Sequence, residues 1–145
     1  MGAWHVILSF QCLFTFLLTG LIWSIQLVSY PLFSLVDREK FCDFERKFQK
    51  KISFLLFPWM VLECFFSILM LTVAKEGVDK IVTCLLFIPL LFIWFSTFCL
   101  QIPEHVELSN GFNFKNLKRL TLTNWIRTVA WTVRSGLLLW LLIRA

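Results

Sequence analysis

The chain has 145 residues, of which 59% are hydrophobic and only 16% are charged. Soluble domains carry about a quarter charged residues, and a chain of this length could not bury so much apolar surface, so the composition excludes an ordinary soluble fold. The formal charge of +5 does not indicate a nucleic-acid-binding protein, because the basic residues gather at the ends of apolar runs and form no dense patch. We therefore expect no nucleic-acid partner and take the lipid bilayer as the surroundings.

Four apolar segments predict an all-α protein, a bundle of four transmembrane helices that run up, down, up and down. They cover about residues 4–36, 52–74, 81–102 and 120–143. Each exceeds the ~18 residues that mark a membrane helix, and a backbone in lipid must satisfy its own hydrogen bonds. The N-terminus lacks a basic region and a cleavage site, so we expect a retained helix and not a signal peptide. No linker divides the chain, which predicts a single domain over residues 1–145.

The distribution of Lys and Arg predicts the orientation in the membrane. The loops after the first and third segments are rich in basic residues, whereas the opposite side has only Lys75, Lys80 and Arg144. By the positive-inside rule, these two loops are cytoplasmic and both termini are outside, in a bacterial inner (plasma) membrane. The basic residues of the two loops are Arg38, Lys40, Arg46, Lys47, Lys50, Lys51, Lys115, Lys118 and Arg119.

The two basic loops carry structural signals of their own. In VDREKFCDFERKFQKKI the spacing of Phe41, Phe44 and Phe48 fits either an amphipathic helix at the headgroups or an extension of the second helix into water. The other loop, PEHVELSNGFNFKN, holds Pro103 and an Asn-Gly step, so we expect it to begin with a turn.

Cysteine and histidine patterns predict neither a disulfide framework nor a metal site. The five cysteines are scattered, with no CxxC pair and no Cys/His cluster. His5 and His105 lie too far apart in the sequence to form an obvious metal site. We expect free cysteines and no metal, and the sequence identifies no cofactor.

The fourth segment contains a polar stripe. At about 100° per residue, Asn124, Arg127 and Trp131 fall on one helix face, which should point into the bundle. Two central arginines cost roughly 5–7 kcal/mol of insertion free energy, about what the apolar residues return, so pairing should matter. We expect Arg134 to extend towards the outer surface and Arg127 to need a partner.

Glu63, the one acid inside an apolar segment, is the candidate partner of Arg127. Counted from the cytoplasmic side, Glu63, Arg127 and Gln26 lie about 18, 12 and 15 Å deep. This common layer predicts a Glu63–Arg127 ion pair with Gln26 and Asn124 nearby. Such a pair fits a lock between helices and a functional cavity equally well.

The candidate site therefore has two groups of residues. Glu63, Arg127 and His105 are the candidate catalytic residues: an acid–base group, an oxygen-binding cation and a histidine at the cytoplasmic mouth. The candidate ligand-binding residues are Trp23, Gln26, Tyr30, Gln101, Asn124, Trp125 and Trp131, with Trp94 as a further aromatic wall. The spacing of Trp23, Gln26, Tyr30 and Pro31 is echoed by Trp94, Thr97, Gln101 and Pro103, which suggests an internal duplication.

The stretches WSIQLVSYPLF, FCDFERKFQKKI, PWMVLE, QIPEHVELSNGF and NWIRTVAWTVRSG together resemble an uncharacterised group of small bacterial four-helix membrane proteins, distantly similar to the anthrone-oxygenase-like membrane proteins. The resemblance covers nearly the whole chain and implies a four-helix bundle. It places Glu63, His105, Asn124, Trp125 and Arg127 at matching positions. The group often has histidines just before Tyr-Pro, where this chain has Ser29, and near Phe48, which weakens the case for an oxygenase.

Two functions are compatible with these features. The first is a site inside the bundle that binds or transforms a small lipophilic molecule, such as an aromatic, quinone-like or isoprenoid compound. The second is a structural or assembly subunit, whose polar stripe packs helices or contacts a membrane protein partner or a second copy. A transporter is a third reading, which would require dimers. The sequence leaves open whether the protein is an enzyme.

Overall fold

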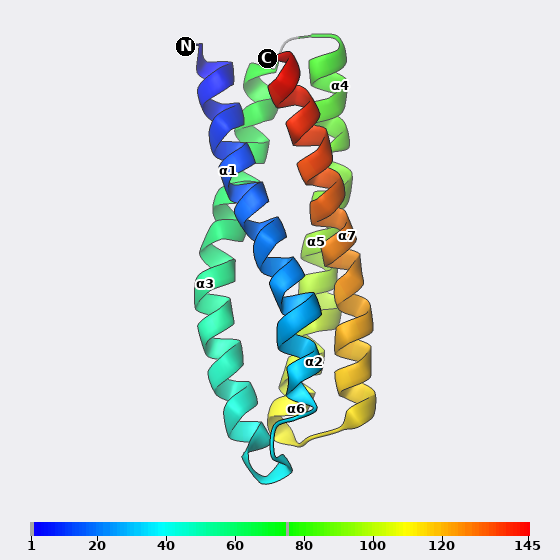
Figure 1. Ribbon diagram of the computed structural model, residues 1–145. Helices are drawn as coiled ribbons and strands as arrows, with labels where there is room; N and C mark the ends of the chain where they lie inside the picture. Colours follow the sequence, from blue (N-terminus) through cyan, green and yellow to red (C-terminus); the bar gives the residue numbers. More distant parts are fainter. Residues whose placement is uncertain (1, 75) are drawn as a thin grey trace.

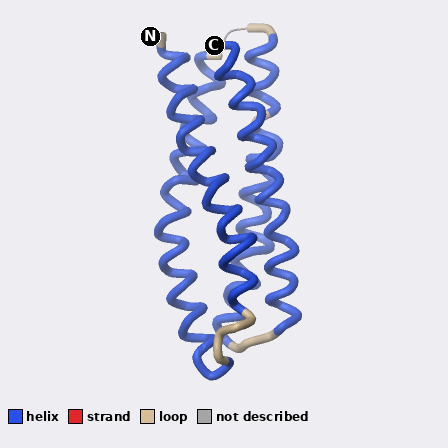
Figure 2. Tube along the Cα trace, in the orientation of Figure 1, coloured by secondary structure: helices blue, strands red, loops and turns tan. Residues whose placement is uncertain are grey.

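The computed structural model describes residues 2–74 and 76–145, and every element in these ranges is helical (Figure 2). The elements are α1 (Ala3–Ser24), η1 (Ile25–Ser29), α2 (Tyr30–Phe33), α3 (Arg38–Val73), α4 (Val78–Leu85), α5 (Phe87–Ser96), η2 (Thr97–Gln101), α6 (Ile102–Asn110) and α7 (Phe114–Arg144), where η denotes a π-helical turn. They stack into four spans, numbered 1 to 4 in chain order: Ala3–Phe33, Arg38–Val73, Val78–Asn110 and Phe114–Arg144. Each is long and apolar enough to cross a membrane, so the chain is a multi-pass membrane protein with the expected four-helix architecture.

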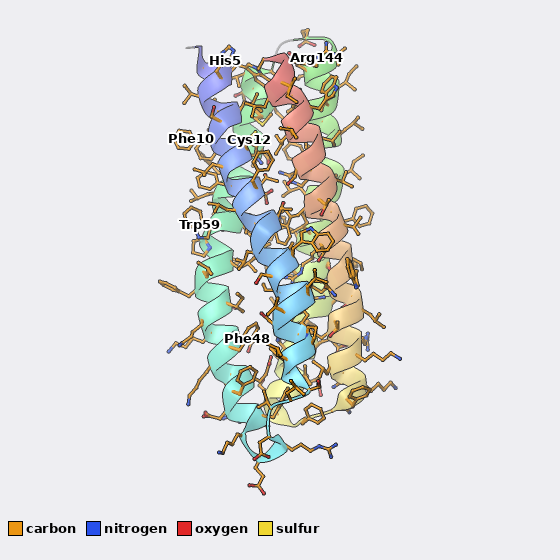
Figure 3. The ribbon with its side chains drawn as sticks, in the orientation of Figure 1. His5, Phe10, Cys12, Phe48, Trp59 and Arg144 are labelled. Carbon is orange, nitrogen blue, oxygen red and sulfur yellow. The ribbon has the colours of Figure 1, made fainter. Side chains whose placement is uncertain are left out.

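The spans run up, down, up and down. Both termini lie at one end of the bundle, and the loops before α3 and before α7 lie at the other (Figure 1). At the terminal end, Nε2 of His5 is 3.0 Å from the carbonyl oxygen of Ala145, and Figure 3 shows His5 and Arg144 there together. The two basic loops therefore lie at the same end of the bundle, opposite the termini. Lys75, one of the cations counted for orientation, lies outside the described residues.

The segment with the three phenylalanines extends the second span. α3 is continuous from Arg38 to Val73, so the extension reading is correct for this loop. The ring of Phe33 packs against the rings of Phe44 and Phe48, at centroid distances of 5.2 and 4.8 Å. This apolar contact holds the extension against the end of span 1.

The expectation of a turn at Pro103 was wrong, because α6 continues to Asn110 and the loop begins only at Gly111. Pro103 stands in the first turn of α6. A proline is tolerated there because its missing N–H removes only a bond that the preceding π turn has already displaced. The Asn-Gly step, not the proline, marks the end of the span.

Two prolines coincide with the two π turns. The N–H of Tyr30 bonds to the carbonyl of Ile25, and the N–H of Ile102 bonds to that of Thr97, five residues back in each case. Pro31 and Pro103 follow directly and cannot donate the usual bond, so the chain widens just before them. The extra residue rotates the side chains that follow by about 100° relative to a regular α-helix. Both turns stand at the same point of the suspected repeat, although the duplication itself stays a prediction.

The buried core has two apolar clusters at different heights. One, at the terminal end, includes Leu8, Met70 and Leu138. The larger one includes Ile22, Met60 and Trp131 and continues towards the basic loops.

Candidate functional site

The polar stripe of α7 faces the interior of the bundle. Asn124, Arg127, Thr128 and Trp131 are all buried, and Arg134 is fully buried as well. Arg134 does not extend towards the surface, as the sequence suggested, because its guanidinium is bonded inside the bundle. The stripe therefore packs the four spans together and is not available to contact another protein.

Glu63 pairs with Arg134 and not with Arg127, so the predicted ion pair was assigned to the wrong arginine. Nε of Arg134 lies 3.0 Å from Oε1 of Glu63. Arg127 and Arg134 are seven residues apart on α7, which is about two turns, so both face inwards but at different heights. Depth counted along the apolar segments could not decide the pair, because Glu63, at about 18 Å, lies between Arg127, at about 12 Å, and Arg134, at about 22 Å.

The Glu63–Arg134 pair, which we call the clasp, has a full set of hydrogen bonds. The Glu63 carboxylate also accepts bonds from the Thr15 hydroxyl at 2.7 Å and from the Trp131 indole N–H at 3.0 Å. Arg134 donates to the Ser67 hydroxyl at 2.9 Å and to the carbonyl of Leu86. Leu86 marks the break between α4 and α5, three residues before Pro89, which has no N–H for the carbonyl of residue 85.

The clasp ties all four spans together and leaves both carboxylate oxygens satisfied. A buried ion pair is tolerated when its remaining hydrogen-bonding groups have partners, as they do here. Its closed geometry fits a structural role, which is one of the two readings that the sequence left open for Glu63.

Arg127 has a different environment. Its Nε and Nη2 donate to Oδ1 of Asn124 at 2.9 and 2.6 Å, and Nη2 also lies 3.4 Å from Oε1 of Gln101. Nη1 makes only a long contact of 3.5 Å, with the Thr97 hydroxyl. No carboxylate lies within ion-pair distance of this buried guanidinium in the described part of the chain.

The π turns supply the amides around Arg127. Gln26, in η1, accepts a bond of 2.7 Å from the side-chain amide of Asn124 and donates one to the carbonyl of Thr121. Gln101, in η2, donates to the Thr123 hydroxyl at 2.8 Å. The sequence correctly placed Gln26 and Asn124 beside Arg127. These amides accept hydrogen bonds from Arg127 or from each other but supply no counter-charge to it.

A cavity of about 120 Å³ lies beside Arg127, between α3 and the η2–α6 part of span 3. Arg127, Tyr30, Gln101 and His105 form its polar part. Gln49, Ser53 and Thr97 also line it, and its remaining walls are apolar: Ile25, Phe48, Ile52, Leu56, Phe57, Met60 and Ile102. Ser53, Phe57 and Ile102 at its edge are exposed, so the cavity opens sideways towards the surroundings of the bundle. We call this cavity the Arg127 pocket; Phe48 marks its level in Figure 3.

A chain of three buried side chains borders the pocket. The Tyr30 hydroxyl lies 3.2 Å from Nε2 of His105, and Nδ1 of His105 bonds to Oε1 of Glu45. The three residues come from α2, α6 and α3, and all are nearly or fully buried. His105 is therefore not at an open mouth, as the sequence suggested, but inside the bundle.

The predicted tryptophans do not form one aromatic slot. Trp131 is buried in the clasp, whereas Trp23 and Trp125 stack edge to face, 5.6 Å apart, at the outer surface. Trp125 is 38% exposed and lies outside the Arg127 pocket. Trp94 packs against Phe57, at a centroid distance of 6.1 Å, next to the pocket edge. The positions of the tryptophans did not predict the walls of the pocket, because indole side chains also favour the membrane–water interface.

Sequence reasoning missed Glu45 and the role of Arg134. Glu45 follows Phe41 by four residues and precedes Phe48 by three, so it shares their helix face. That spacing was a usable signal, but a glutamate in a charged loop is usually solvated. Within the described ranges, no group of three His, Cys, Asp or Glu residues is gathered as metal ligands would be.

Comparisons with protein families, with curated proteins and with solved structures found no match.

Proposed function

We propose that this protein binds a small lipophilic molecule with an oxygen-bearing head in the Arg127 pocket. The observation that carries the proposal is a buried guanidinium that lines a cavity and pairs with no carboxylate among the described residues. A buried charge without a counter-charge is costly, and such groups in membrane proteins mark binding or transport sites. A carbonyl, hydroxyl or anionic oxygen of a ligand would compensate it.

The shape of the pocket supports a ligand that arrives from the bilayer. Its largely apolar lining suits rings or short hydrocarbon chains, and Arg127, Tyr30 and Gln101 offer hydrogen bonds to a polar head. Its sideways opening would let a longer tail remain among the lipid chains. An aromatic, quinone-like or isoprenoid compound satisfies these conditions.

The surroundings that we propose are a bacterial inner (plasma) membrane, with the basic loops in the cytoplasm and both termini outside. In this orientation the Arg127 pocket lies in the cytoplasmic half. The exposed Lys47, Lys50 and Lys51 at the same end suit anionic headgroups of the cytoplasmic leaflet. The relationship to the four-helix group that the sequence resembles also remains a proposal.

The test compares the small molecules that copurify with the wild-type protein and with matched variants. Wild-type protein is extracted into lipid nanodiscs, and the bound small molecules are identified by mass spectrometry. Ser53→Trp places a large ring at the pocket edge, whereas Val61→Trp adds the same ring to the exposed surface of the same helix. We expect a compound that is enriched with wild type and Val61→Trp and lost from Ser53→Trp and Arg127→Met. Identical bulk lipid from all four proteins would contradict the proposal.

A structural or assembly subunit is the second reading, and the clasp is the observation in its favour. The clasp accounts for Glu63 and Arg134, but not for the unpaired guanidinium and the cavity around Arg127. We therefore assign the structural role to the clasp and the binding role to the Arg127 pocket.

A further inference from the structure

The hydrogen-bond chain Glu45–His105–Tyr30 borders the Arg127 pocket and has no part in holding the spans at the clasp. Glu45 is completely buried, and only one of its oxygens has a partner: Oε1 bonds to His105, whereas Oε2 has none in the described part of the chain. The Glu45 carboxylate therefore lies directly beside the imidazole ring and accepts the bond from its Nδ1–H.

Tyr30 has two acceptors for its one proton. Its hydroxyl lies 3.2 Å from Nε2 of His105 and 3.5 Å from Oε1 of Gln101. When His105 is neutral with its proton on Nδ1, Tyr30 donates to Nε2. When His105 is protonated, Nε2–H donates to the Tyr30 oxygen, and the Tyr30 proton turns to Gln101. Both arrangements keep every bond of the chain, and they differ by one proton.

The charged groups around this chain come from three helices. Glu45 lies on α3, and Arg127 of α7 lines the same pocket as Tyr30. Glu104 of α6, next to His105 in the sequence, is paired with Arg119 at 2.9 Å. A ligand oxygen in the pocket thus lies near a cation, Arg127, and near a proton acceptor, His105, which it reaches through the Tyr30 hydroxyl.

We propose that the pocket takes a lipid-soluble compound with an acidic hydroxyl group, a phenol or an enol, and removes its proton through Tyr30 to His105. The proposal rests on the proposed binding function and names its ligand class. The ligand O–H bond breaks and its proton passes to the Tyr30 oxygen, while the Tyr30 proton passes to Nε2 of His105. The products are a phenolate or enolate beside Arg127 and an imidazolium beside Glu45.

The net charge of the site does not change in this transfer. Before it, the site holds the cation of Arg127 and the anion of Glu45; afterwards it holds two pairs of opposite charges. A neutral hydroxyl compound can cross the apolar opening, whereas a preformed anion would have to leave water for lipid at high cost. Ionisation after arrival avoids that cost.

The test uses an alkylated nitrophenol, whose phenolate is coloured, with its methyl ether as a matched probe that has no proton to give. Both are titrated into protein in nanodiscs, at a pH where the free phenol is neutral, with a pH indicator present. We expect saturable binding of both probes to wild type. With the phenol, the phenolate colour should develop with almost no net release of protons to water, because His105 retains the proton.

Variants separate this inference from simple binding. His105→Gln and Glu45→Gln should still bind the methyl ether, which shows a folded pocket, but the phenolate fraction should fall about tenfold or the colour should appear with release of one proton per ligand. Unchanged colour and unchanged proton balance in both variants would overturn the proton transfer alone. If neither probe binds to wild type, the proposed binding function fails and this inference with it.

Discussion

Arg134 and Glu63 lie 3.0 Å apart in the interior of the bundle, and both are completely shielded from the surroundings. Their hydrogen bonds reach Thr15, Ser67 and the carbonyl of Leu86, so this one pair contacts three other helices besides α7. Four helices that are apolar on most of their surfaces have little else to fix their mutual rotation, because lipid is as apolar as their side chains.

The clasp predicts strong coupling between its two charges. Glu63→Gln should lower the free energy of unfolding by about 3–5 kcal/mol, because it leaves Arg134 buried without a counter-charge. The double variant Glu63→Gln/Arg134→Met should recover much of that loss. Unfolding by denaturing detergent, followed by helical circular dichroism, measures both. Additive losses in the double variant would show that the two side chains do not interact.

Arg127 and Arg134 should respond differently to the same substitution. We expect the loss in unfolding free energy for Arg127→Met to be at least about 2 kcal/mol smaller than for Arg134→Met, because only Arg134 leaves a buried carboxylate unpaired. The same unfolding assay applies, and each variant is the control for the other. Equal losses would indicate that Arg127 is also a structural ion-pair partner.

The tryptophans of α7 should differ in their access to lipid. Trp125 is 38% exposed, whereas Trp131 is fully buried and bonded to Glu63. In bilayers with brominated acyl chains, Trp125→Phe should reduce the quenchable part of the fluorescence, and Trp131→Phe should leave it unchanged. A larger effect of Trp131→Phe would mean that α7 is rotated by about half a turn from the arrangement described.

The orientation of the four spans can be tested by cysteine labelling. In a variant without the five native cysteines, single cysteines at Leu35 and Gly111 should react from the cytoplasmic side with a maleimide that cannot cross membranes. Cysteines at Glu76 and Ala145 should react from the other side. The positive-inside rule is the reason, since the basic loops hold most of the Lys and Arg residues. Labelling with the sides exchanged would reverse the topology and place the Arg127 pocket in the outer half.

Several features of this protein could be predicted from local patterns. The four spans follow from hydropathy, because a segment of sufficient apolar length is stable across a bilayer whatever its neighbours are. The inward direction of the α7 stripe follows from helical periodicity, because polar groups are expensive against lipid. The neighbourhood of Arg127, Asn124 and Gln26 followed from the same reasoning.

The partner of Glu63 could not be predicted in this way. Arg127 and Arg134 lie on similar faces of one helix, and the choice between them depends on how far α3 is shifted along its axis relative to α7. That shift is fixed by side-chain contacts between spans, such as the packing of Phe33 against Phe44 and Phe48, which the sequence does not show.

The sequence by itself thus determined the four apolar spans and the polar interior, because both depend on the free energy of placing side chains in lipid. Only the tertiary structure decided which charges meet, which one remains free, and that Glu45 and His105 share a buried hydrogen bond. The physical reason is that pairing depends on atomic distances between helices. These distances depend on the axial shifts between helices and on the π turns before Pro31 and Pro103. Neither can be predicted from the hydropathy and periodicity of each span taken alone.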